Sequence, residues 1–309
     1  MRSRRFKIWL VSLSLLQPLT ALANISVDTD TLRLQFSQQG DLLRAESCFP
    51  SCSDKGAKNR VLSAGQGMLV LQQDNSPQLQ VEQVHGNSTT TLSFTDLSGQ
   101  LIHRWQIPDQ GWMISLGSPG TKAASLMSGE NFRPVPSSGF GYLLEQSRYL
   151  IFDGSSVETI GLDESEQTTH TSNGWLGFRN RFWAAMVLPA TPLSITPETG
   201  ELVKDARVDL TAAEGSQGID LDLYLGPVEP GALSGAADEL ESLMYSGLWF
   251  WLGWICQALY FLLNAIVVVV PQWGLAVMVL SVLVGIVMRP LSKFADRLQD
   301  QVHEIDTRL

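Results

Sequence analysis

The sequence predicts a mixed fold, in which an exported all-β domain precedes an α-helical membrane segment. Three observations carry this prediction. Short runs of alternating apolar and polar residues, separated by turn residues, fill the chain from residue 24 to about residue 235. No Asp, Glu, Lys or Arg occurs from Gly247 to Met288, which is too long an uncharged stretch for a helix in a soluble core. The first 23 residues are organised like an export signal.

Residues 1–23 predict a signal peptide or an N-terminal anchor. A basic start precedes an apolar run from Ile8 to Leu16, and small residues stand at Ala21 and Ala23, as at a signal-peptidase site. The apolar run is short compared with the ~20 residues that a membrane span needs. This favours cleavage after Ala23 over retention as an anchor. In both cases, the residues that follow lie outside the cytoplasm.

The composition narrows the possible partners. The net charge of the chain is −10, and without the four basic residues of the first seven positions it is −14, from 17 basic and 31 acidic residues. Such acidity argues against nucleic acid, because phosphate binding needs clustered Lys and Arg. The sequence shows no nucleophile elbow, phosphate-binding glycine loop or helical zinc motif. We therefore expect neither an enzyme nor a cofactor.

Residues 24–235 predict an antiparallel β-sandwich of about 200 residues. Leu32, Leu34 and Phe36 alternate with polar residues, and the clearest alternation runs from Ile219 to Leu225, which predicts a strand with one wet and one buried face. Clusters of Gly, Asn, Ser and Asp separate the runs, as in an all-β domain.

Aromatic and acidic residues of this domain allow two interpretations. Four tryptophans could belong to the core or could line a carbohydrate-binding cleft (Trp105, Trp112, Trp175 and Trp183). The acidic run from Asp163 to Glu166 resembles a solvated loop, although paired carboxylates could support glycoside hydrolysis. The core and the solvated loop are the favoured interpretations.

Cys48 and Cys52 are separated by three residues and are predicted to form a disulfide in an oxidising compartment. Free thiols are the alternative. A metal site is disfavoured because it would need two further ligands, and the four histidines show no ligand spacing to either cysteine.

The membrane end is predicted to contain four segments. Residues 236–246 form an amphipathic connector, residues 247–270 an apolar helix, residues 272–291 a second apolar helix, and residues 292–309 a polar helix. Two full spans would leave the basic residues after Met288 outside, against the positive-inside rule. We therefore favour a first helix that lies along the outer interface and a second that crosses inward, with two spans as the alternative.

The tail resembles the YidC-type membrane protein insertases of Gram-negative bacteria. The resemblance rests on Gly-Leu-Trp-Phe at 247–250, Trp273-Gly274 and Pro-Leu-Ser-Lys at 290–293. It extends to Gly174-Trp175 and to Tyr-Leu-Gly-Pro at 224–227. It implies a periplasmic β-supersandwich domain, an interfacial helix and a transmembrane helix in the inner membrane. It also implies insertion and folding of nascent inner-membrane proteins, with the lipid bilayer and the secretion translocon as further partners and no cofactor.

The chain departs from the family at two points. Gly285 stands where the resemblance places the arginine of a translocation groove, and Arg289 follows one turn later on the same helix face, as Ser281 precedes it. Arg289 could extend to the headgroups or replace the groove charge. The family also has further transmembrane helices beyond the hairpin that begins at residues 292–309. The chain could therefore be part of an insertase, a subunit completed by another polypeptide, or a degenerate paralogue. The alternative function is a membrane-tethered periplasmic binding module for glycans or translocon partners.

Overall fold

The computed structural model describes residues 24–56, 58–62, 67–72, 78–129, 148–152, 157–161, 169–198, 206–245 and 250–306. The signal segment 1–23 and the acidic run 163–166 lie outside these residues. The chain divides into two compact units, Met1–Met244 and Tyr245–Leu309, and each is described separately.

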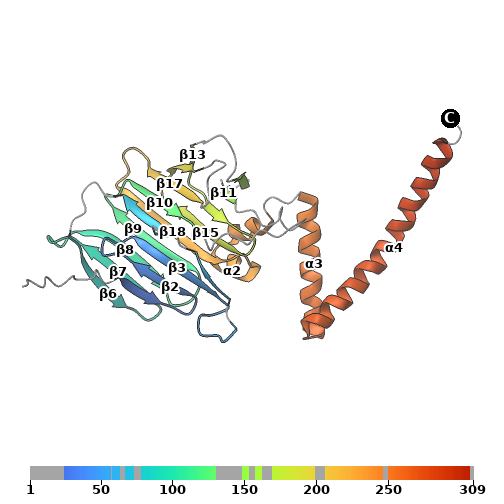
Figure 1. Ribbon diagram of the computed structural model, residues 1–309, viewed down its shortest axis with the longest axis horizontal. Coiled ribbons are helices and arrows are strands. Elements are labelled where there is room, and N and C mark those ends of the chain that lie inside the picture. Colours follow the sequence, from blue (N-terminus) through green and yellow to red (C-terminus); the bar gives the residue numbers. More distant parts are fainter. Residues whose placement is uncertain are drawn as a thin grey trace, which may run out of the picture. The chain divides into compact units, whose positions relative to one another are not determined.

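The described residues of the first unit form two antiparallel sheets of nine strands each (Figure 1). In sheet A the order is β1-β2-β3-β5-β10-β17-β16-β13, with β4 paired to β3. Its strands are β1 (Ile25–Asp28), β2 (Leu32–Phe36), β3 (Leu42–Phe49), β4 (Lys58–Val61), β5 (Leu69–Gln72), β10 (Ala123–Met127), β13 (His170–Ser172), β16 (Leu193–Pro197) and β17 (Arg207–Ala212).

Sheet C has the order β12-β11-β14-β15-β18-β9-β8-β7-β6. Its strands are β6 (Gln80–His85), β7 (Thr89–Thr95), β8 (Leu101–Pro108), β9 (Met113–Pro119), β11 (Arg148–Phe152), β12 (Val157–Gly161), β14 (Leu176–Arg179), β15 (Trp183–Pro189) and β18 (Gly218–Pro227). β15 and β18 are distant in sequence but pair in register from Trp183↔Pro227 to Pro189↔Leu221.

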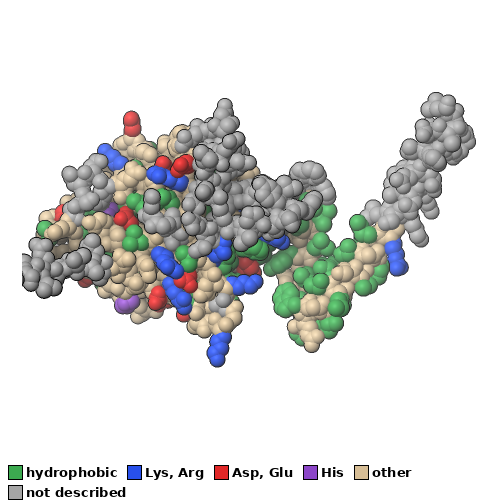
Figure 2. Space-filling view, in the orientation of Figure 1, with side chains coloured by type: hydrophobic (Ala, Val, Ile, Leu, Met, Phe, Trp, Pro, Cys, Tyr) green, Lys and Arg blue, Asp and Glu red, His purple; other side chains and the backbone are tan. Residues whose placement is uncertain are grey.

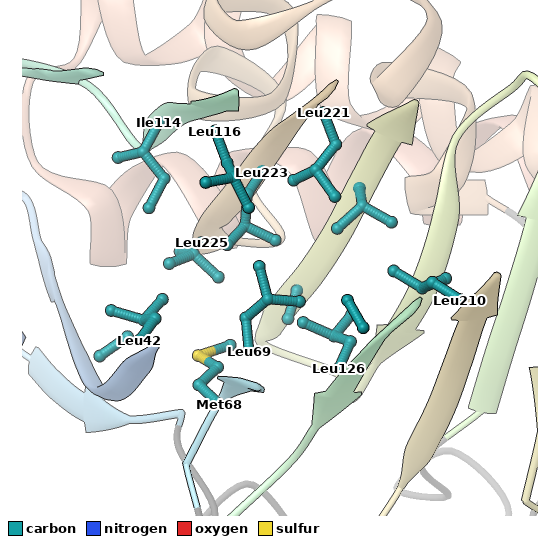
Figure 3. Packing of buried hydrophobic residues seen from close by; sticks show 14 of the residues in the cluster. Leu42, Met68, Leu69, Ile114, Leu116, Leu126, Leu210, Leu221, Leu223 and Leu225 are labelled. Carbon is teal, nitrogen blue, oxygen red and sulfur yellow. The ribbon is translucent and has the colours of Figure 1, made fainter. Parts of the chain in front are cut away.

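The main core lies between the two sheets because alternate side chains of each strand point inward. In β2 the residues Leu32, Leu34 and Phe36 are fully buried, as the sequence pattern predicts. Figure 3 shows the facing side chains: sheet A contributes residues such as Leu69 and Leu126, and sheet C contributes residues such as Leu116 and Leu223. The predicted β-sandwich is confirmed.

A second apolar cluster lies on the outer face of sheet C. Here α2 (Pro230–Ala236) and the 3-10 helix η2 (Asp238–Tyr245) contribute Leu233 and Leu240, both fully buried. They pack in one cluster with Tyr224, which is also fully buried. Strand β18 therefore has a wet outer face at Asp220 but not at Tyr224, so the expectation of a wholly wet face is wrong at that residue.

The second unit consists of two helices, α3 (Phe250–Val269) and α4 (Trp273–Asp306). α4 is continuous through Pro290, although the sequence suggests separate helices before and after residue 291. At 1.5 Å per residue its 34 residues extend over about 51 Å. By length and composition, Leu252–Val269 of α3 is the one stretch among the described helices that could cross a membrane, and Trp273–Arg289 is a shorter apolar stretch.

Candidate functional site

The predicted groove residues lie on one face of α4, because Ser281, Gly285 and Arg289 recur at a spacing of four. All three are exposed. The Ser281 hydroxyl donates to the carbonyl oxygen of Val277 at 2.9 Å, so its proton is used within the helix. A Cβ atom built at Gly285 would meet nothing within 4 Å. This face is therefore open and mostly apolar, and Arg289 is its charged end.

Arg289 ends the uncharged stretch that begins at Gly247. Sixteen residues separate it from Trp273, which corresponds to about 24 Å of helix. The hydrocarbon core is about 30 Å thick, so a helix anchored by Trp273 at one interface places the Arg289 backbone short of the other. A guanidinium on a long flexible side chain can cover the remaining distance to the headgroups. From the same position it can also pair with a polar flank of a neighbouring segment.

The surface of α3 is apolar around most of its circumference. Trp254, Phe261 and Val268 are each more than 70% exposed, and hydrophobic side chains gather on the described parts of both helices in Figure 2. Gly253, Gln257, Tyr260 and Asn264 recur at spacings of four, three and four along α3; Gln257 and Tyr260 are exposed, Asn264 is half-buried and Gly253 is buried. Length and composition thus favour α3 as a span, whereas charge placement favours α4. The assignment remains a proposal.

The four tryptophans of the sandwich domain belong to its packing. Trp105, Trp175 and Trp183 are at least 92% buried, and Trp112 is half-buried between the two apolar clusters. The indole NH of Trp105 donates to the carbonyl oxygen of Gly40 at 2.9 Å, and that of Trp112 donates to the carbonyl oxygen of Cys48 at 3.1 Å. These residues do not form the stacking cleft that was one interpretation of the sequence.

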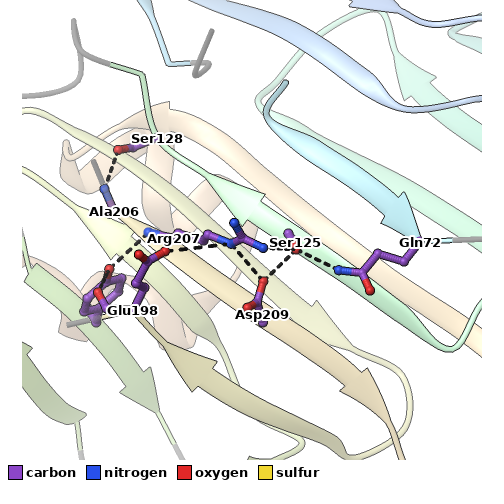
Figure 4. Close-up of polar contacts among 8 residues, drawn as sticks. Gln72, Ser125, Ser128, Glu198, Ala206, Arg207 and Asp209 are labelled. Carbon is purple, nitrogen blue, oxygen red and sulfur yellow. Dashed lines mark hydrogen bonds and ion pairs between the residues drawn. The ribbon is translucent and has the colours of Figure 1, made fainter. Parts of the chain in front are cut away.

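A polar network surrounds Arg207 on sheet A (Figure 4). Its guanidinium lies 3.1 Å from the Asp209 carboxylate and 3.9 Å from that of Glu198. Ser125 donates to the same Asp209 carboxylate at 2.6 Å. The contacts link neighbouring strands, and the charged and polar groups in them are partners of one another. We therefore interpret this network as structural. Sequence reasoning did not find it, because its members come from three strands that are distant in sequence.

A buried polar group occupies the other sheet. His103 of β8 is fully buried, and its Nδ1 lies 2.7 Å from the Ser118 hydroxyl, which donates to Thr121 at 2.7 Å. Desolvation by burial lowers the pKa of His103 to about 4. The imidazole is therefore neutral at ordinary pH and has no access to solvent. This excludes a role in proton transfer to a ligand.

A hollow of about 290 Å³ lies over strands β8, β9, β15 and β18 of sheet C. The register places Arg104, Gly117 and Asp220 in one row across three strands. Ser115 lies in the next row and donates to Asp222 at 2.5 Å. A Cβ atom built at Gly117 would lie 3.2 Å from the Asp220 carboxylate, so the glycine makes room for that side chain.

Cys48 and Cys52 are joined by a disulfide in the structure, with an S–S distance of 2.04 Å. Cys48 is fully buried at the end of β3, and Cys52 is half-buried in the following turn. The backbone NH of Cys52 donates to the carbonyl oxygen of Asp30 at 2.6 Å. The disulfide therefore belongs to a hydrogen-bonded end of the sandwich.

Comparison with known proteins supports the resemblance inferred from the sequence. Residues 127–262 match the family model of the YidC periplasmic domain. The chain is 27% identical over 256 residues to a protein of Beijerinckia indica named membrane protein insertase YidC, a match that covers 75% of this chain and 42% of that protein. A protein of the same name from Anaeromyxobacter dehalogenans is 28% identical over 222 residues, covering 67% of this chain and 41% of that protein. The matches thus span about two fifths of these relatives, and the predicted resemblance is confirmed.

Proposed function

We propose that this chain, which is similar to the YidC membrane protein insertases, acts as an insertase of that type or as its N-terminal part. The observation that carries the proposal is the extent of the family match. The match begins at Met127, the last residue of β10, and ends at Leu262, inside α3. One matched range thus joins the exported domain to the first membrane helix, in the order that the tail pattern predicts.

The proposed location is the bacterial inner membrane, with the sandwich domain in the periplasm. In this arrangement α3 lies along the periplasmic interface and α4 crosses inward, so that Arg289 and Lys293 reach the cytoplasmic side. The arrangement agrees with the positive-inside rule. It requires α3, the more apolar helix by length, to remain on the outer side.

The proposed activity is to lower the cost of moving polar flanks of nascent inner-membrane proteins through the bilayer. A charged group inside hydrocarbon is expensive, and a nearby protein charge reduces that expense. The open face that ends at Arg289 supplies one such group. A single helix does not enclose a groove, so further helices, in the same chain or a partner, would complete it. No chemical step is involved, and the secretion translocon is a proposed further partner.

Complementation of a bacterial strain depleted of its own insertase tests this proposal. The chain is expressed alone and together with any membrane protein encoded beside it. Restored growth and restored insertion of a reporter membrane protein are expected in at least one arrangement. An Arg289→Gln variant separates the two roles of Arg289, because a headgroup anchor tolerates the loss while Lys293 and Arg297 remain. If the chain reaches the membrane at normal abundance but insertion fails in every arrangement, the proposal is wrong.

A further inference from the structure

At one end of the exported domain, a series of contacts runs from the disulfide to the segment leading into α3. The starting point is Trp112, whose indole NH donates to the carbonyl oxygen of Cys48 at 3.1 Å. The ring of Phe49, next to Cys48, lies 6.0 Å from the Trp112 ring. The backbone NH of Cys48 donates to the carbonyl oxygen of Thr31 at 2.9 Å, and the disulfide adds a covalent link from this end of β3 to the turn that follows it.

Trp112 is in turn a support for the end of β18. Its carbonyl oxygen accepts a hydrogen bond from the backbone NH of Leu225 at 2.8 Å. A Cβ atom placed on Gly226 would lie 2.8 Å from the Trp112 Cβ and 2.6 Å from the Tyr224 ring, so only glycine permits this approach. Trp112 packs against both apolar clusters of the domain. A displacement of the indole would therefore disturb the cluster that contains Tyr224.

Tyr224 packs against the segment that precedes α3. It packs in the second cluster with Leu233 of α2 and Leu240 of η2, all three fully buried. Its hydroxyl donates to the carbonyl oxygen of Pro227 at 2.7 Å, which fixes the chain immediately before α2. η2 ends at Tyr245, and α3 begins at Phe250. A 3-10 helix of eight residues is longer than these helices usually are, so it depends on tertiary packing.

We propose that the Cys48–Cys52 disulfide holds the connector, defined as α2 and η2, in its docked position through Trp112. The Cys48–Cys52 disulfide forms on export, when the two thiols are oxidised. The thiols give two electrons and two protons to the disulfide of a partner protein. That disulfide is reduced to two thiols as the Cys48–Cys52 bond forms. Before oxidation the end of β3 lacks its covalent link to the turn, so the acceptor of the indole is held only by the sheet, and the connector opens more readily.

Hydrogen exchange on the full chain in lipid nanodiscs tests the proposal. The wild type is compared with a variant in which Cys48→Ser and Cys52→Ser are combined. Exchange of the 230–245 backbone is expected to rise roughly fivefold in this variant. The turn at Ser118–Thr121, at the opposite end of sheet C, should be unchanged. A Ser118→Ala variant, which disturbs that opposite end, is the matched control and should leave 230–245 as in the wild type.

A Trp112→Phe variant separates this route from a general loss of stability. It removes the indole NH and keeps an aromatic ring, so exchange of 230–245 should rise with the disulfide intact. Loss of the disulfide in that background should then add less than it does in the wild type, because the two changes act in one path. Unchanged exchange of 230–245 without the disulfide, or full additivity with Trp112→Phe, would overturn the proposal.

Discussion

The hydroxyl of Tyr149 in sheet C donates a hydrogen bond to the carbonyl oxygen of Glu198 beside sheet A, at 2.6 Å. The Tyr149 hydroxyl oxygen in turn accepts a hydrogen bond from the backbone NH of Arg207 at 3.0 Å. Tyr149 is 1% exposed, so the Tyr149 end of this polar link between the two sheets is buried. It forms beside the Arg207 network and connects that network to the opposite layer.

Replacing Tyr149 by Phe should destabilise the domain by about 1–3 kcal/mol, because the Arg207 NH and the Glu198 carbonyl would lose their common partner. Thermal or chemical unfolding followed by near-UV circular dichroism measures the change. Tyr260→Phe, in α3, is a suitable control because that residue is 39% exposed and outside the domain. An unchanged unfolding midpoint for Tyr149→Phe would show that the link contributes nothing.

His103 should make the stability of the domain depend on pH. Its pKa is lowered to about 4 in the folded state by desolvation and is ~6.5 in an unfolded chain. The unfolded chain therefore binds the proton first as the pH falls. Above pH ~6.5 this protonation does not reduce the free energy of unfolding. Near pH 4 it reduces the free energy of unfolding by about 3 kcal/mol.

The measurement is the free energy of unfolding between pH 7.5 and 4.5. His103→Gln should flatten the pH dependence, because the amide does not titrate and can still pair with Ser118. His85→Gln, at an exposed histidine, should retain the wild-type slope. Equal slopes in all three proteins would contradict the assignment.

The sequence predicts the layers of this domain well, because period-two alternation depends on local pattern alone. Leu32, Leu34 and Phe36 are buried as their spacing implies. The pattern misplaces Tyr224, because the helices that cover it come later in the chain and the contact is set by tertiary packing. It also could not find the Tyr149 link, whose partners lie 49 and 58 residues away.

For the candidate site, the sequence predicts which residues share one face of the helix. It does not predict what that face contacts. The 3.6-residue period places Ser281, Gly285 and Arg289 together on any helix. The hydrogen bond from the Ser281 hydroxyl to the Val277 carbonyl depends on the side-chain conformation within the folded helix. Whether this face borders a groove depends on neighbouring helices, and a sequence pattern within α4 contains no information on those.

Only one of the three cysteines should react with a thiol reagent while the disulfide is intact. In denaturant without reductant, iodoacetamide should modify Cys256 alone, because Cys48 and Cys52 are bonded to each other. With reductant, all three cysteines should be modified. Mass spectrometry of the peptides distinguishes the results. Modification of Cys48 in the unreduced protein would show that the disulfide does not form in the cell from which the protein was taken.

The proposed direction of α4 across the membrane rests on its charges, and it can be measured. If α4 crosses inward, residue 293 lies in the cytoplasm and residue 272 at the periplasmic surface. Lys293→Cys and Gln272→Cys, each made in a Cys256→Ala background, place one free thiol at either end. A membrane-impermeant maleimide should label Gln272→Cys in intact spheroplasts. It should label Lys293→Cys only after the membrane is opened. Labelling of Lys293→Cys in intact spheroplasts would mean that α3 crosses inward and α4 returns, which would place Arg289 at the outer surface and remove it from any cytoplasmic groove.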